Sequence, residues 1–317
     1  MSRRFYGFVL LLIPTVILGS ALSVFAQEKA SSAETVPITT VVTVLGPKFT
    51  PPPAIGKEDV IVHEAKNRLN VTGWIPAQGD KAGLELAIVI DDSSSTDLGL
   101  QLSDLTTFIK SQPKTAGIGL FYASNGTVQA ASQFNTDHEA VAKSLRLPFG
   151  VGGGISSVYL SVMDLMSRWP ATGMRREILL IADGIDRFRG DIPTSTDVQS
   201  TMDRAQKAGI MIHTLYVTGV GRASRNMFRI NLGQSNLSRI ADATGGEAFF
   251  QGTQTPISFG PYLQQLEMVL KNQFLLTFSI PRSKKPKGEL RPIRVRTEQH
   301  NVEISAAEKV FVRGPAR

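Results

Sequence analysis

The segment Asp91-Asp92-Ser93-Ser94-Ser95 directly follows an apolar run and carries side chains suited to hold a metal ion. The carboxylate of Asp91 and the hydroxyls of Ser93 and Ser95 stand at alternate positions of a short loop, so all three can face one centre. Hard oxygen ligands of this kind suit Mg²⁺, with Mn²⁺ and Ca²⁺ as less selective alternatives. Asp and Ser also make ordinary turns and helix caps. The loop alone leaves both interpretations open.

Two further loops carry oxygen ligands. Gly152-Gly-Gly-Ile-Ser156-Ser157 opens a predicted helix, and Ala182-Asp183-Gly184-Ile-Asp186 ends a predicted strand. In a parallel sheet with helices on both faces, such loops meet at the edge formed by the carboxyl ends of the strands. The sequence therefore predicts a divalent metal site made by Asp91, Ser93, Ser95, Ser156 and Asp183. Ser157 is an alternative to Ser156.

Buried strands alternate with amphipathic helices around these loops. The run 84–90 is almost continuously apolar, as expected of a parallel strand covered on both faces. Leu98, Leu102, Leu105 and Ile109 follow at helical spacing, with Asp97 as the expected cap. Further strands are predicted at 118–123, 128–134, 177–182, 210–217 and 248–251, and further helices at 158–169, 198–208, 237–243 and 262–272.

This alternation predicts an α/β fold with a doubly wound, mostly parallel sheet and helices on both faces. The flanks are β-rich, with strand-like segments at 36–45, 60–64, 69–75, 274–280, 290–296, 302–305 and 310–312. We expect the two flanks to form one β-rich appendage. The predicted divisions are a signal peptide (1–26), a flexible leader (27–35), an N-terminal β element (36–80), the α/β domain (81–255) and a C-terminal helix with strands (256–317).

The N-terminus has the order of an export signal. Arg3 and Arg4 precede the apolar run 8–18, and the small residues Val24 and Ala26 precede Gln27. This pattern predicts cleavage before Gln27 and a secreted or periplasmic protein without a stable membrane anchor. An uncleaved anchor is the alternative, although Pro14 and the short apolar run disfavour it.

Composition excludes several classes of protein. The 317 residues are 42% hydrophobic and 19% charged, which is globular rather than disordered or fibrous. The chain has no cysteine, so disulfides, thiolate nucleophiles and cysteine metal sites are excluded. Without the two arginines of the leader the net charge falls from +7 to +5. Part of this charge lies in 282–287, which we interpret as a solvated hairpin rather than a nucleic-acid surface because no aromatic residues interleave.

The three metal loops resemble a known family. Asp91-x-Ser93-x-Ser95, a later hydroxyl and a later Asp-Gly resemble the metal-ion-dependent adhesion site of von Willebrand factor type A (VWA) domains. The resemblance implies that Asp91, Ser93 and Ser95 ligate the ion directly or through water. It places Ser156 in the usual threonine position, and Asp183 either behind the direct ligands or bridged to the ion by water. Serine for threonine at 156 and Ala182 for the usual threonine are departures that put the metal affinity in doubt.

The flanks extend the resemblance. The segments 55–64 and 270–278 are similar to the flanks of exported VWFA-related proteins described as acidobacterial. With them the resemblance covers roughly 36–312, although the flanks are less specific than the metal loops.

Other sites find less support. The glycines of 150–154 lack the Lys-Ser/Thr of a phosphate loop, and His63, His138, His213 and His300 show no zinc spacing. The sequence best fits an exported protein-binding module, not an enzyme, that captures an acidic group of an unidentified partner protein through Mg²⁺. A scaffold with a vestigial site, or a metal-assisted hydrolase with Asp92 or Asp186 as base, are the alternatives.

Overall fold

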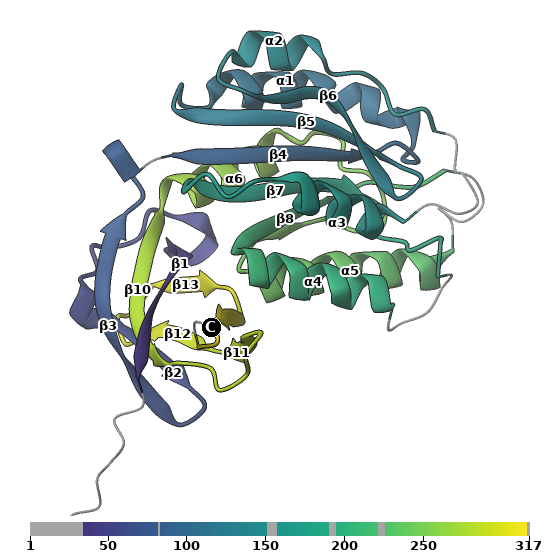
Figure 1. Ribbon diagram of the computed structural model, residues 1–317. Coiled ribbons are helices and arrows are strands. Elements are labelled where there is room, and N and C mark those ends of the chain that lie inside the picture. Colours follow the sequence, from purple (N-terminus) through teal and green to yellow (C-terminus); the bar gives the residue numbers. More distant parts are fainter. Residues whose placement is uncertain (1–33, 82, 151–156, 190–194, 221–225, 316–317) are drawn as a thin grey trace, which may run out of the picture. The chain divides into compact units, whose positions relative to one another are not determined.

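The central sheet positions the predicted metal loops. In a computed structural model, which describes residues 34–81, 83–150, 157–189, 195–220 and 226–315, this sheet has the strand order β6-β5-β4-β7-β8-β9 (Figure 1). The strands are β4 (Leu84–Asp91), β5 (Ala116–Ser124), β6 (Thr127–Asn135), β7 (Arg175–Ala182), β8 (Ile210–Tyr216) and β9 (Ala248–Phe249). All neighbours are parallel except β5 and β6. The predicted α/β class with a mostly parallel sheet is confirmed.

Helices cover both faces of this sheet because alternate residues of β4 point to opposite sides. Leu86, Ile88 and Ile90 pack with α1 (Leu102–Ser111), α2 (His138–Lys143) and α6 (Gly260–Lys271). Ala87 and Val89 pack with α3 (Val158–Arg168), α4 (Thr196–Ala208) and α5 (Met227–Thr244). With both faces buried, every residue of β4 is shielded from water, Asp91 included.

A second sheet joins the two ends of the described chain. Its order is β12 (Arg294–Thr297), β2 (Val60–Glu64), β3 (Asn67–Pro76), β10 (Gln273–Pro281), β1 (Thr35–Leu45) and β13 (Glu303–Ala306), and all its pairings are antiparallel. β11 (Glu289–Pro292) and β14 (Lys309–Val312) form a separate pair. Short 3₁₀ turns complete the described elements at Pro47–Phe49 (η1), Lys57–Asp59 (η2), Gly79–Lys81 (η3) and Thr96–Gln101 (η4).

Two helix starts differ from the prediction. The cap after β4 is Ser95 rather than Asp97, because the Ser95 hydroxyl accepts the Asp97 N–H at 3.2 Å and the η4 turn precedes α1. α5 begins at Met227, ten residues before the predicted start, because the Asn226 side chain accepts the Arg229 N–H at 3.2 Å. The sequence prediction also missed α2, whose cap is Asp137.

A close backbone contact fixes the loop that follows β7. Gly184 has a positive φ of 72°, and a Cβ at Gly233 of α5 would lie 2.0 Å from the Asp183 carbonyl oxygen. Asn236 of α5 and the Tyr159 hydroxyl of α3 both donate to the Gly184 carbonyl, at 3.2 and 2.5 Å. Contacts with α3 and α5 therefore fix the position of the Asp183 loop.

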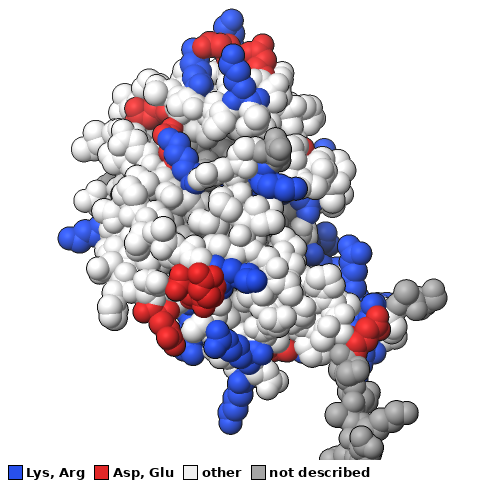
Figure 2. Space-filling view, turned by 90° about the vertical axis from the view of Figure 1, so that its left-hand side faces the viewer, with Lys and Arg blue, Asp and Glu red and all other residues white. Residues whose placement is uncertain are grey.

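Charged side chains are spread over the surface. On the face in Figure 2, Lys and Arg stand singly or in small groups, several of them beside Asp or Glu, with wide neutral areas between them. None of the described helices is long and apolar enough to cross a membrane.

We predict that Gly233→Ala lowers the free energy of unfolding by about 2–3 kcal/mol. Alanine normally stabilises a helix interior relative to glycine by about 0.5–1 kcal/mol, so a loss here isolates the contact with Asp183. Gly117→Ala on β5 is the matched control, since its added Cβ meets neighbours only at 3.8 Å or more. Urea unfolding measures the free energy of unfolding of both variants. A Gly233→Ala protein as stable as the Gly117→Ala protein would contradict the close contact.

Candidate functional site

Asp91 ends β4 with its carboxylate buried and 2% of the residue exposed. One oxygen, Oδ1, accepts the Ser93 N–H at 2.9 Å and the Ser93 hydroxyl at 2.7 Å. The loop therefore folds back so that Ser93 stands on the Asp91 carboxylate. The other oxygen, Oδ2, lies 3.9 Å from the Arg187 guanidinium.

Asp183 lies beside Asp91 because β7 is the parallel neighbour of β4, with Ile90 opposite Ile181. Its Oδ1 accepts the Ile185 N–H at 3.0 Å, and the residue is buried. Its Oδ2 forms an ion pair with the Arg187 guanidinium. Two carboxylates from adjacent strand ends thus face one guanidinium.

Arg187 is the residue that sequence analysis missed. Its guanidinium contacts Asp183, donates to the Ser93 hydroxyl at 3.2 Å and reaches toward Asp91, with only 16% of the side chain exposed. The sequence held one signal for this role: Arg187 is a basic residue four positions after Asp183, in a loop that was expected to bind a metal ion. This arginine occupies the position at which the predicted ligands converge.

The charges in this cluster do not cancel. Burial, followed by repulsion from Asp183, raises the pKa of Asp91 to about 6, although Arg187 and Ser93 act in the opposite direction. Two carboxylates face a single guanidinium, so one arginine has to offset the charge of both groups. Such a position attracts a further or a stronger cation.

The predicted ligands differ in how the structure places them. Asp91, Ser93 and Asp183 meet around Arg187, whereas the Ser95 hydroxyl in the same loop caps η4. Ser156 lies outside the described residues. Its alternative, Ser157, is fully buried, and its hydroxyl caps α3 by accepting the Leu160 N–H at 3.4 Å.

The loop after β8 completes the site. Ser95 donates its N–H to the Thr218 carbonyl at 3.0 Å, and Ser94 pairs with Gly219 as an isolated bridge. A Cβ at Gly219 would lie 2.2 Å from Asp183 Oδ2 and 2.7 Å from the Arg187 guanidinium. A side chain at 219 would therefore enter the cation position, which only glycine leaves open.

The oxygens of Asp91, Ser93 and Asp183 suit a hard divalent cation, provided that Arg187 releases them. Among the described residues no three Asp, Glu or His side chains gather as a metal site, so the oxygens available to a metal here are those of two carboxylates and a hydroxyl. These oxygens match Mg²⁺ or Mn²⁺, which bind few protein ligands and keep other positions for water. The condition is that the Arg187 side chain moves away, because its guanidinium holds the same oxygens.

The two carboxylates considered as a general base are engaged elsewhere. Asp92 accepts two hydrogen bonds from the Arg146 guanidinium at 2.7 and 2.8 Å and one from the Phe149 N–H at 3.1 Å. Asp186 accepts from the Ser195 hydroxyl and from the Arg189 N–H. Both carboxylates hold loops in place around the cation position.

Exposed apolar side chains surround this edge of the sheet. Ten large apolar side chains are exposed among the described residues. Eight of them lie in segments that follow the carboxyl ends of the parallel strands, or in segments that connect to those strand ends. They are Leu100, Leu147, Phe149, Phe188, Met227, Phe228, Phe250 and Ile257. We name this set the apolar rim. Sequence analysis missed it because single apolar residues in loops carry no periodic signal.

No family model and no curated protein matches the chain. Among solved structures it is similar to a VWA protein from Catenulispora acidiphila (9% identity, 90% of this chain and 75% of that chain, TM-score 0.42). It is also similar to BatB of Bacteroides thetaiotaomicron, with 14% identity over 60% of this chain and 100% of that chain and a TM-score of 0.43. A third similar structure is manganese-loaded TRAP of Plasmodium vivax, with 8% identity over 79% of this chain and 98% of that chain and a TM-score of 0.42. At identities of 14% or less, these are likenesses of fold.

We predict that Arg187→Ala destabilises the protein by about 3 kcal/mol, because it leaves two buried carboxylates without a counter-charge. Adding Asp183→Asn should restore more than half of that loss, as a double-mutant cycle would measure. Lys110→Ala is the control, since its pair with Glu139 is exposed on both sides and contributes less than about 1 kcal/mol. An Arg187→Ala protein as stable as wild type would contradict the ion cluster.

Proposed function

We propose that this chain is an exported VWA-type module that binds a partner protein at the edge of the sheet formed by Asp91, Asp183 and the apolar rim, and that it performs no chemistry there. The observation that carries the proposal is that two buried carboxylates face one guanidinium at the sheet edge where the eight exposed apolar side chains of the rim also lie. An exposed apolar surface of this kind is typical of a protein interface.

Each part of the edge has a distinct role in this proposal. Asp91 and Asp183 supply negative charge and Ser93 a hydroxyl oxygen, and the Arg187 side chain swings out to free these ligands. A bound Mg²⁺, or Mn²⁺ or Ca²⁺ in its place, would supply an open coordination position for a carboxylate of the partner. Arg187 then competes with the metal, so that metal binding is weaker than the ligand set alone would allow.

The apolar rim supplies the binding energy in this proposal. Phe149, Phe188 and Phe228 are 66%, 46% and 57% exposed, which leaves aromatic surface available for burial by a partner. Aromatic and methionine side chains are enriched at protein interfaces, and a few of them carry most of the binding energy. The partner carboxylate then provides specificity rather than most of the affinity.

A scaffold without a metal is the second candidate function. The observation that favours it is Arg187, which already gives Asp91 and Asp183 a cation. In that case the rim still binds a partner, and the carboxylates serve only to hold the loops together.

Export belongs to the proposal as well. The order of arginines, apolar run and small residues before Gln27 supports it. We expect the chain recovered from its source cell to begin near Gln27. Mass analysis that finds residues 1–26 intact in a membrane fraction would contradict cleavage.

Affinity capture from an envelope extract of the source cell tests the binding function. We expect Asp91→Asn, the double change Phe149→Ser with Phe188→Ser, and chelator on wild type each to reduce the captured partner at least tenfold. Ile75→Ser should leave capture unchanged, because Ile75 is exposed on β3 and lies outside the rim.

The outcomes separate the two functions. Capture that resists chelator and Asp91→Asn but is lost with the two phenylalanines supports the scaffold without a metal. Capture that none of the variants reduces would contradict a binding surface at this edge.

A further inference from the structure

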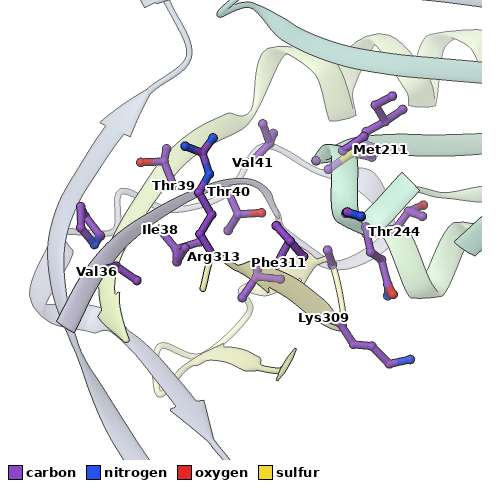
Figure 3. A pocket seen from close by; sticks show the side chains of 18 of the residues that line it. Val36, Ile38, Thr39, Thr40, Val41, Met211, Thr244, Lys309, Phe311 and Arg313 are labelled. Atoms are coloured by element: carbon purple, nitrogen blue, oxygen red, sulfur yellow. The ribbon is translucent and has the colours of Figure 1, made fainter. Parts of the chain in front are cut away.

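A groove runs along β1, away from the Asp91 loop. It has a volume of about 610 Å³ and is lined by the first half of β1, the end of α4, the start of β8 and β14 (Figure 3). β8 begins in the groove at Ile210, whereas the Asp91 site lies beyond its other end at Tyr216. At about 3.3 Å per residue, these two ends are on the order of 20 Å apart. The groove is therefore separate from the proposed metal site.

One wall of the groove is an open strand edge. β1 bonds to β10 through its even-numbered residues, as the hydrogen bonds from Arg282 N–H to the Glu34 carbonyl and from Val44 N–H to the Asn272 carbonyl show. The backbone groups of the odd-numbered residues therefore point to the other side. There β13 pairs with β1 only from Val42 to Leu45. The backbone groups of Thr35, Pro37 and Thr39 thus face the groove without a strand partner among the described residues.

The position of Pro37 agrees with this geometry. Proline has no N–H, so it is tolerated in a strand where its nitrogen points away from the ladder. Thr39 keeps both an N–H donor and a carbonyl acceptor on the open side, and Thr35 does the same. An added strand can therefore use donors and acceptors of β1 at alternate residues.

The groove has a basic character. Its lining includes Lys207, Arg282, Lys309 and Arg313, and no acidic residue is among the described residues that line it. Arg282 pairs with Glu34, and Lys309 lies 3.7 Å from Asp203. Lys207 stands over the Phe311 ring at 5.1 Å, and neither Lys207 nor Arg313 has a carboxylate partner among the described residues. In Figure 3, Arg313, Phe311 and Lys309 follow one another from the side of Val36 to the side of Thr244.

The open edge continues into a second hollow of about 430 Å³. The two hollows share Thr39, Thr40, Val41, Ala208 and Gly209, and the second adds Lys81 and Arg176 to the lining. Again no acidic side chain lines it among the described residues. Strand edge and positive charge therefore run together past Thr39.

We propose that this groove binds an extended acidic segment of a partner protein, which adds to β1 as a further strand and places its Asp or Glu side chains against Arg313, Lys309 and Lys207. Backbone hydrogen bonds at alternate residues supply the register of strand addition, and the basic side chains select the charge of the segment. A nucleic acid or another polyanion would satisfy the cations but would leave the donors and acceptors of Thr35 and Thr39 without their natural partner. The open backbone edge thus favours a peptide.

Fluorescence anisotropy with the purified chain tests the proposal. The probe is a labelled octapeptide in which glutamate alternates with valine and threonine. One matched peptide carries lysine in place of glutamate, and another carries N-methyl groups on alternate amides, which block strand hydrogen bonds. We expect the acidic peptide to bind and both matched peptides to bind at least tenfold more weakly.

Variants of the groove locate the binding. Thr39→Pro removes the N–H on the open side and spares the ladder with β10, and Arg313→Glu with Lys309→Glu reverses the charge. Each of these variants should bind the acidic peptide at least tenfold more weakly than wild type. Lys284→Glu is the control, because Lys284 lies outside the lining of both hollows. The charge-reversal variant decides the question if Thr39→Pro changes the circular dichroism spectrum.

Three results would overturn the proposal. They are no binding of the acidic peptide at millimolar concentration, equal binding of the N-methylated peptide, and complete competition by an oligodeoxynucleotide of equal charge with no effect of Thr39→Pro. The last result would identify a general polyanion surface. Because no probe or variant involves Asp91, Asp183 or the apolar rim, the outcome is independent of the proposed function at the other edge.

Discussion

The burial of Asp91 and Asp183 at neighbouring strand ends is the constraint around which the edge of the sheet is organised. Two carboxylates in a shielded place repel each other, and burial already raises the pKa of Asp91 to about 6. Arg187 offsets this cost by contacting Asp183 and the Ser93 hydroxyl and by facing Asp91. The loops after β4, β7 and β8 are then fixed with respect to one another, since each contributes to the same position.

A cluster of this kind can be a stable ion pair or a site that exchanges its cation. A purely structural cluster would be more stable with equal numbers of opposite charges. Here two carboxylates, Asp91 and Asp183, share one guanidinium. Gly219 keeps space beside Asp183 that any side chain would fill. The apolar rim exposes aromatic surface at the same edge, at a cost in solubility that a binding surface would explain. These features favour an exchangeable cation in an interface.

Much of this arrangement could be predicted from the sequence. Continuous apolar runs such as 84–90 identify parallel strands, and parallel strands bring the Asp91 and Asp183 loops to one edge whatever the details of the helices. Periodicity did not predict the start of α5, because the Asn226 cap precedes a turn whose exposed Met227 and Phe228 look unlike a helix. Arg187 was missed for a different reason. Whether an arginine points into solvent or onto buried carboxylates depends on the loop conformation, which residue type and spacing do not determine.

The open half of β1 likewise depends on tertiary structure. The strand itself follows from the β-branched residues of 36–45, but which of its sides remains unpaired is decided by where β13 begins to pair, at Val42. Pro37 lies within this predicted strand, and only the register reveals that its nitrogen points to an open edge. Two potential binding surfaces thus arise at opposite ends of β8 from segments far apart in sequence.

The central claim is that one position between Asp91, Ser93 and Asp183 accepts either the Arg187 guanidinium or a divalent metal. Diffraction from crystals soaked in Mn²⁺, measured at the manganese absorption edge, tests it most directly. The account predicts an anomalous peak among these three side chains, with the Arg187 side chain turned away from Asp183. Crystals in which the guanidinium stays on Asp183 and no anomalous peak appears at saturating Mn²⁺ would contradict it.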